Sequence, residues 1–165
     1  MKTRSFTCAA LPLFLCGAFL FSGCHQEKRA GEVPLVALKT YSGETYTVSP
    51  KDTSVTLVVF WATWCGPCKM EMPILMALQD MYGKRGFRVV GINIDDPDGS
   101  KARPIMEYYH INYPMLIGDQ ETIKKFGGLN GIPTSFLVGR DGMLKKKTEG
   151  VAFGDQLEQE ILAQL

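Results

Sequence analysis

The chain has 165 residues, with 18 basic and 17 acidic side chains and a formal net charge of +1. Apolar residues make up 45% of it, which is enough for one packed domain of ordinary size. This balance excludes a protein that binds nucleic acid through bulk basicity, and it excludes a disordered acidic or basic tail.

The N-terminal residues follow the three-part pattern of a secretory signal peptide. A basic start precedes an almost uninterrupted apolar run over residues 6–21, shorter than the roughly 20 residues that span a membrane as a helix. Small residues then lead to Cys24 in a string that resembles a bacterial lipobox. We therefore expect a lipoprotein signal peptide over residues 1–23, lipidation at Cys24 and a polar tether over residues 24–34. An uncleaved membrane anchor and plain secretion are the alternatives, and each places the domain outside the cytoplasm.

The five cysteines divide by their position in the chain. Cys8 and Cys16 leave with the signal peptide, and Cys24 would carry lipid. Only Cys65 and Cys68 then remain as thiols, with two residues between them.

We expect one domain over residues 35–165. The residue pattern in its first half predicts a hairpin, a strand and a helix. Segments 35–39 and 44–48 flank a Ser-Gly turn and predict the hairpin. The run 54–62 is β-branched and aromatic on both faces, as in a strand buried on both sides. Residues 66–84 carry apolar residues at helical spacing, with Pro73 inside, whose ring should kink the helix.

The second half alternates strands and helices. We expect a buried strand at 87–94, a helix at 101–110, a short strand at 115–117, a brief helix at 121–126, a hairpin of 134–138 with 143–147, and a terminal amphipathic helix at 155–165. This order predicts an α/β fold with a mixed central β-sheet and helices on both faces.

Cys65 and Cys68 stand where the buried strand 54–62 gives way to a helix. Two intervening residues let the sulfurs reach bonding distance in one tight turn. The N–H groups and the positive dipole end of a helix start stabilise a thiolate, and they lower a cysteine pKa from about 8.5 to about 7. We therefore expect Cys65 to attack a substrate disulfide and Cys68, more buried, to resolve the mixed disulfide.

Metal and haem sites are alternative uses of such a pair. Zinc needs four ligands, and the mature sequence adds only His25 and His110 to the two thiols. Haem attachment would need a histidine directly after Cys68, where Lys69 stands. We therefore expect no zinc and no cofactor.

Two further alternatives are a copper-binding metallochaperone and a peroxidase. Met70, Met72 and Met76 are soft ligands near the thiols, although methionine at helical spacing more often fills a core. A peroxidase of the peroxiredoxin type would want threonine three residues before its reactive cysteine, where Ala62 stands. The copper chaperone is the non-enzymatic alternative that remains open.

The string Phe60-Trp61-Ala62-Thr63-Trp64-Cys65-Gly66-Pro67-Cys68-Lys69 resembles the active site of the thioredoxin superfamily, and Gly131-Ile132-Pro133-Thr134 strengthens the match. More narrowly, residues 35–165 are similar to the TlpA/ResA-like membrane-tethered thiol-disulfide oxidoreductases of the bacterial cell envelope. This resemblance implies a thioredoxin-like fold with an N-terminal β-hairpin and the α insertion of that family.

The resemblance also implies a substrate-binding surface around the cysteines. Pro133 would be a cis proline that faces the pair, and the backbone of Ile132 would pair with an extended substrate. Trp64, Gly66 and Pro67 would complete this surface.

Proton handling is the point at which the chain departs from cytoplasmic thioredoxins. Val59 stands where they carry a buried acid, and Gly91 stands where they keep a lysine. Glu71 matches an acidic residue of TlpA/ResA-like proteins and could exchange a proton with Cys68 if burial raises its pKa. An exposed helix charge is the alternative for Glu71.

Together these patterns predict a thiol-disulfide oxidoreductase that acts as a protein-disulfide reductase in the cell envelope. The cysteines have no histidine or glutamate between them, which favours reduction; a thiol oxidant of the same fold is the alternative. The resemblance implies apocytochrome c, before haem attachment, as a substrate and an inner-membrane thiol electron donor. We expect a monomer that faces the periplasm, is anchored through its N-terminal lipid and binds no nucleic acid.

Overall fold

The computed structural model describes residues 31–49, 51–152 and 154–165. The signal peptide over residues 1–23, the lipidation at Cys24 and most of the tether lie outside these residues, so they stay predictions. In the part of the chain that is described, no helix has the length and apolar character needed to cross a membrane.

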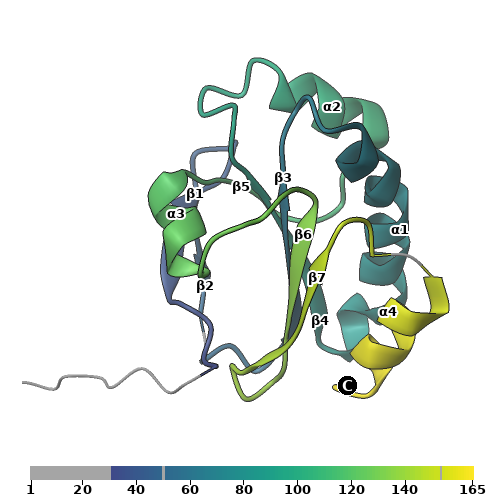
Figure 1. Cartoon of the computed structure of the whole chain (residues 1–165). Helices are drawn as coiled ribbons and strands as arrows, with labels where there is room; N and C mark the ends of the chain where they lie inside the picture. The colour runs from purple at the N-terminus through teal and green to yellow at the C-terminus, as the bar shows by residue number, and fades with distance from the viewer. Residues whose placement is uncertain (1–30, 50, 153) are drawn as a thin grey trace, which may run out of the picture.

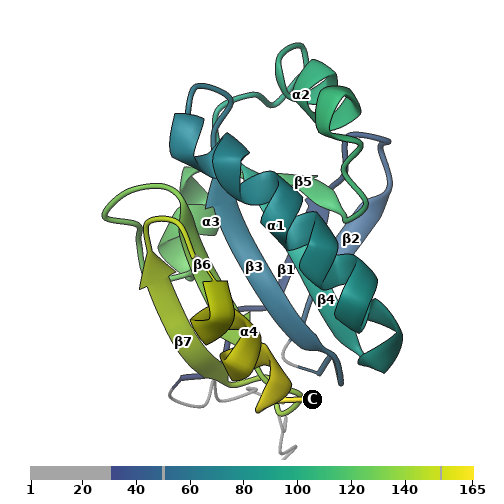
Figure 2. The ribbon, with the colours of Figure 1, turned by 90° about the vertical axis from the view of Figure 1, so that its right-hand side faces the viewer.

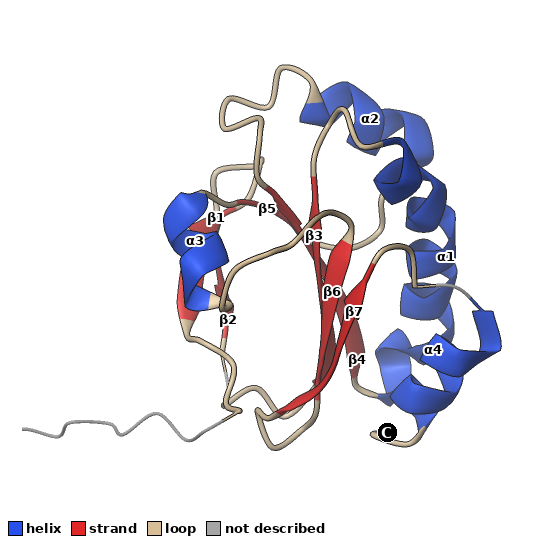
Figure 3. Cartoon of the chain, in the orientation of Figure 1, coloured by secondary structure: helices blue, strands red, loops and turns tan. Residues whose placement is uncertain are grey.

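A mixed five-stranded sheet forms the centre of the domain (Figures 1 and 3). Its strand order is β5 (Met115–Ile117), β4 (Phe87–Asn93), β3 (Val55–Trp61), β6 (Thr134–Val138) and β7 (Leu144–Glu149). Strands β3, β4 and β5 are parallel, whereas β6 runs antiparallel to β3 and β7 antiparallel to β6. The predicted mixed sheet is confirmed.

Helices cover both faces of this sheet (Figures 1 and 2). On one face lie α1 (Gly66–Tyr82), which continues into the short 3-10 helix η1 (Gly83–Arg85), and α4 (Gly154–Leu162). On the other face lie α3 (Gln120–Lys125) and the hairpin of β1 (Val36–Lys39) and β2 (Thr45–Val48). Helix α2 (Ala102–Tyr109) lies at the end of the molecule where α1 begins.

Strand β3 is buried along its whole length because both of its faces meet apolar layers. Leu57, Val59 and Trp61 belong to the core cluster beneath α1, together with Met72 and Leu75 of that helix. Val58 and Phe60 belong to the second cluster, in which Phe60 makes edge contacts with Phe126 and Phe136. This double burial is the physical reason why the segment lacks polar alternation.

The element boundaries differ from the predictions by at most three residues, and the strands at 115–117 and 134–138 match their predicted bounds. Helix α1 continues through Pro73 to Tyr82 rather than to residue 84. Helix α3 begins one residue earlier than predicted, because the side chain of Asp119 caps it by accepting a hydrogen bond from the Thr122 N–H. Differences of this size are ordinary at helix ends, where the last turn frays.

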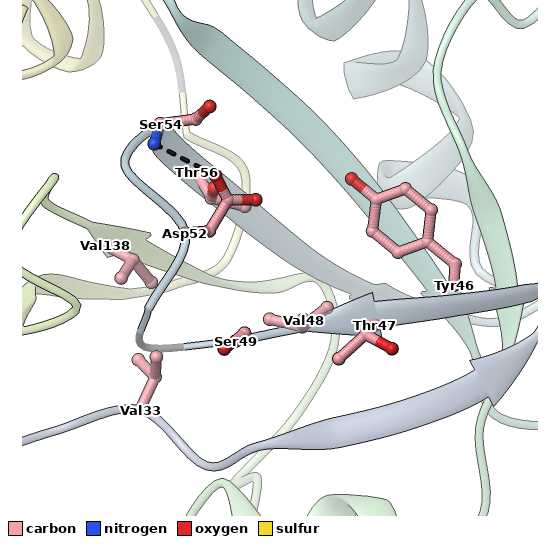
Figure 4. Close-up of a pocket in the computed structure, with 9 residues that line it drawn as sticks. All are labelled: Val33, Tyr46, Thr47, Val48, Ser49, Asp52, Ser54, Thr56 and Val138. Carbon is pink, nitrogen blue, oxygen red and sulfur yellow. Dashed lines mark hydrogen bonds between the residues drawn. The ribbon is translucent and has the colours of Figure 1, made fainter.

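The two ends of the sheet differ in character. The carboxyl end of β3 leads directly into the cysteine pair, whereas the amino end is closed by the segment that enters the domain. There the Val33 N–H donates to the Gly142 carbonyl, and a hollow of about 10 Å³ lies between Val33, β2 and the start of β3 (Figure 4). The chain therefore enters the domain at the end of the sheet opposite the cysteines.

Candidate active site

Cys65 and Cys68 form a disulfide at the N-terminus of α1. Cys65 is the N-cap residue, and its Sγ accepts a hydrogen bond from the Cys68 backbone N–H at 3.2 Å. The first turn of a helix leaves such N–H groups unpaired, so they stabilise negative charge on a sulfur at the N-cap. The predicted place of Cys65 at the start of the helix is therefore confirmed, and it favours a Cys65 thiolate once the disulfide is reduced.

Burial does not distinguish the two cysteines, so the expectation that Cys68 is the more buried one is wrong for this disulfide-bonded form. Each residue is 3% exposed. The bond holds the two sulfurs together within one helical turn, so they share the same environment. Trp64, Gly66 and Pro67 are exposed beside them and form a rim around the buried disulfide; their role in substrate binding stays a prediction.

The peptide bond between Ile132 and Pro133 is cis, as the resemblance implied. In the antiparallel pair of β3 and β6, Thr134 lies opposite Phe60, so Pro133 reaches the same end of the sheet as Cys65. Ile132 is half-buried and packs against the core cluster that contains both cysteines. The fold thus brings together two segments that lie far apart in the sequence.

Glu71 is buried, and the alternative of an exposed helix charge is wrong. It is 1% exposed and shares the inward face of α1 with Cys68, three residues earlier. Its Oε1 accepts a hydrogen bond from the Ala152 N–H at 2.9 Å, whereas its buried Oε2 has no hydrogen-bond partner. Burial raises the pKa of Glu71 to about 7, although the hydrogen bond from Ala152 opposes the rise. A buried acid that titrates near neutral pH therefore lies beside the second cysteine.

Tyr113 is a residue of this site that the sequence reasoning missed. It is 6% exposed and lines, with Cys68, a small cavity of about 10 Å³. Burial raises the pKa of Tyr113 well above its ordinary value, and the negative charge of Glu71 adds to the rise. The sequence holds no signal for it, since an isolated tyrosine before a strand is indistinguishable from any core aromatic.

The two positions at which the chain departs from cytoplasmic thioredoxins both line this cavity. Val59 and Gly91 line it beneath Cys68, and none of the described residues around it carries a charge at neutral pH. A Cβ at Gly91 would lie 2.3 Å from the Met115 Sδ, so any side chain there would displace the Met115 side chain. Glu71, on the helix above, is thus the acid that the structure places near Cys68.

A polar network that the sequence reasoning also missed holds the segment before Cys65. Asp95, just after β4, accepts hydrogen bonds from the Thr63 N–H at 2.8 Å and from the Thr63 Oγ1 at 2.7 Å. The Lys69 Nζ donates to the Thr63 carbonyl at 3.2 Å. These contacts fix the backbone one residue before the rim.

The methionines near the thiols lie on different faces of α1. Met70 is 65% exposed, whereas Met72 is 2% exposed and fills the core. Met70 and Met72 therefore do not lie on the same side of the helix. Within the ranges that the structure describes, no group of three or more His, Cys, Asp or Glu side chains is arranged to hold a metal ion.

Comparison with known proteins identifies the family of the chain. Residues 30–147 match the model of the AhpC/TSA family, which covers more than half of the chain. The thiol-disulfide oxidoreductase ResA of Bacillus thuringiensis subsp. konkukian is 27% identical over 165 residues, 96% of this chain and 95% of the relative. For ResA of Geobacillus thermodenitrificans the match is 29% over 102 residues, which is 62% of this chain and 58% of that relative's length. The thioredoxin-like protein YneN of Bacillus subtilis is 30% identical over 132 residues, 79% of this chain and 76% of the relative.

Solved structures agree with this assignment. A thioredoxin family thiol:disulfide interchange protein from Chlorobium tepidum superposes with a TM-score of 0.74 at 26% identity, covering 84% of this chain and 98% of that one. StoA from Bacillus subtilis shares the fold with a TM-score of 0.64 at 24% identity, covering 79% of this chain and 98% of that one. The chain therefore belongs to the AhpC/TSA family and is a thiol-disulfide oxidoreductase with a thioredoxin-like fold, whose redox pair is Cys65 and Cys68.

Proposed function

We propose that the protein reduces disulfides of exported polypeptides outside the cytoplasm. The observation that carries this proposal is the Cys65 sulfur at the N-cap of α1, where the Cys68 N–H points at it. The exposed rim and the cis-proline segment at the same end of the sheet leave room for an extended chain to approach.

The reaction is a two-step exchange that starts from the dithiol form. The Cys65 thiolate attacks one substrate sulfur, which forms a mixed disulfide and releases the other substrate sulfur as a thiolate. Cys68 then attacks the Cys65 sulfur, which releases the second substrate thiolate and forms the Cys65–Cys68 disulfide. Two electrons pass to the substrate, and a thiol electron donor must restore the dithiol.

Glu71 supplies the proton chemistry of the second step. Cys68 must lose its proton before it attacks, and Glu71 lies on the same helix face three residues away. With a pKa of about 7, its carboxylate is available as a base near neutral pH and can return the proton when the pair is reduced again.

The substrate binds as an extended chain across the rim. The backbone of Ile132 pairs with it like an added strand, while Trp64, Gly66 and Pro67 contact the residues around its cysteine. Apocytochrome c before haem attachment is a candidate substrate, since its cysteines must be kept as thiols.

The location and the electron donor follow from the N-terminal pattern. The lipobox-like string supports anchoring at Cys24 and a domain that faces the periplasm, where we expect the protein to act as a monomer. An inner-membrane thiol carrier is the electron donor that such a location requires.

A redox titration against glutathione tests the direction of the reaction. A potential in the range of about −200 to −270 mV fits a reductant, whereas a value near the about −120 mV of strong periplasmic oxidants would make the protein an oxidant. Tight stoichiometric Cu(I) binding without turnover of disulfides would favour the copper chaperone instead.

Trapping tests the roles of the two cysteines. Cys68→Ala should hold the substrate on Cys65 as a stable mixed disulfide, and Cys65→Ala should hold none. The reverse pattern would exchange the attacking and resolving roles.

A further inference from the structure

Helix α1 is apolar on the face that points away from the sheet as well as on the face that points inward. Its inward face is buried and carries Cys68, Glu71, Met72, Leu75 and Leu78. The opposite face carries an outward stripe, defined here as Met70, Pro73, Ile74, Ala77 and Met81. Met70 is 65% exposed and Met81 is 53% exposed, Pro73 and Ala77 are exposed, and Ile74 is half-buried. In Figure 2, α1 lies in front of the sheet and no other element of the described chain crosses it.

This pattern sets α1 apart from the shorter helices. Arg103 and Glu107 are exposed on α2, and Glu121 and Lys124 are exposed on α3. Between Met70 and Met81, by contrast, α1 has two charged residues: Glu71, which points inward, and the exposed Asp80 beside the stripe, which accepts a hydrogen bond from the Asn112 side chain. A surface helix is expected to carry a polar outer face, so an apolar one marks a contact surface.

The outward stripe is continuous with the redox site. It begins at Met70, two residues after Cys68, and helical side chains lean toward the N-terminus, so Met70 extends the rim at Pro67. From Met70 to Met81 the stripe runs about 16 Å along the axis, at 1.5 Å per residue. An extended chain covers that distance with about five residues.

The size and charge of the stripe indicate what covers it. A strip of about 16 Å by the width of one helix is far smaller than the about 800 Å² that each partner contributes to a stable dimer. The stripe residues carry no charge, and the one acid beside them, Asp80, already accepts a hydrogen bond from Asn112, so a polyanion finds no cation there and a basic tail finds only one partly paired carboxylate. Because the stripe is continuous with the disulfide, the occupant that remains is a transient partner already held at Cys65.

We propose that the outward stripe binds an apolar stretch of the same polypeptide whose disulfide exchanges with Cys65. This inference rests on the proposed function and adds a substrate class to it. The substrates it selects carry apolar side chains about three to five residues from the exchanging cysteine. The rim contacts the substrate cysteine itself, and the stripe contacts substrate residues farther along the same chain.

Two synthetic peptides test this inference. Each carries one cysteine as a mixed disulfide with glutathione and has identical residues directly beside that cysteine. At the third to fifth positions on both sides, one peptide has leucine and the other has serine. For the reduced, otherwise unsubstituted protein, we expect kcat/KM for the leucine peptide to exceed that for the serine peptide about tenfold, equivalent to about 1.4 kcal/mol.

Two matched double variants introduce one acidic and one basic residue each, the first on the stripe and the second, as a control, outside it. Ala77→Glu with Met81→Lys puts an i,i+4 pair on the stripe that favours the helix and leaves the net charge unchanged. The ratio of the two kcat/KM values should fall below about twofold in this variant. Leu35→Glu with Leu162→Lys changes two exposed apolar residues outside α1 and should retain the full ratio.

Three results would overturn the inference. One is a similar rate for both peptides with the unsubstituted protein, and another is a full preference in the stripe variant. The third is a dimer, seen by sedimentation, that the stripe variant dissociates, because the stripe would then be a contact between copies. Glutathione disulfide is too small to reach the stripe, so failure of the unsubstituted dithiol protein to reduce it would instead sink the proposed function.

Discussion

Replacing Glu71 by glutamine removes an ionisable group from the core but keeps an oxygen that can accept the hydrogen bond from the Ala152 N–H. In the native protein, burial raises the pKa of Glu71 to about 7 from the ordinary 4.5. That difference corresponds to about 3 kcal/mol of stability that depends on pH.

The sign of the effect follows from which state binds the proton. Below pH 4.5, Glu71 is protonated in both the folded and the unfolded chain. Between the two pKa values, the folded protein keeps a proton that the unfolded chain has lost, so rising pH favours unfolding. The contribution is therefore lost as pH rises through about 7, and above that the folded protein carries a buried carboxylate.

Urea unfolding of the disulfide-bonded proteins at several pH values between 4 and 8 measures this contribution. The free energy of unfolding of Glu71→Gln, minus that of the unsubstituted protein, should rise by about 3 kcal/mol across this range. Other titrating groups cancel in the difference. Glu107→Gln, at an exposed position of α2, serves as the control and should give a difference that does not change with pH.

A Glu71→Gln difference that stays flat within about 0.5 kcal/mol, the size of an ordinary surface effect, would refute the reasoning. It would mean that Glu71 ionises as freely as a glutamate in water. Resolution of the mixed disulfide provides a second readout, since its rate should rise through pH 7 in the native protein and lose that rise in the variant.

Two further predictions concern residues around the pair. Gly91→Ala should destabilise the protein by about 1–3 kcal/mol, because the new Cβ would lie 2.3 Å from the Met115 Sδ. In urea unfolding, Met115→Ala in the same chain should recover part of that loss, and Gly131→Ala, whose Cβ meets nothing within 4 Å, should not share it. Asp95→Ala should cost about 1–3 kcal/mol by removing the acceptor of two Thr63 hydrogen bonds. It should also alter the alkylation rate of reduced Cys65; an unchanged rate would show that Asp95 does not position the nucleophile.

The central strand, the helix that follows it and the cysteine pair between them could be predicted from the sequence, because their signals are local. Strand β3 carries apolar residues on both faces, with Thr56 as its single polar residue, and this pattern identifies a strand covered on both sides. Two thiols with two residues between them at a helix start specify a redox pair for the same reason. The strand, the helix and the cysteine pair each depend on residues that are close together in the sequence.

Which face of α1 would be buried was decided only by the tertiary structure. The helix has apolar residues on both faces, so its periodicity does not distinguish Glu71, inward and 1% exposed, from Met70, outward and 65% exposed. Ala152, which donates to Glu71, and Pro133, which reaches the end of the sheet near Cys65, are distant in sequence and meet through the packing of the sheet. A pKa depends on burial and on partners from other segments, so the chemistry of Glu71 became visible only once the chain was folded.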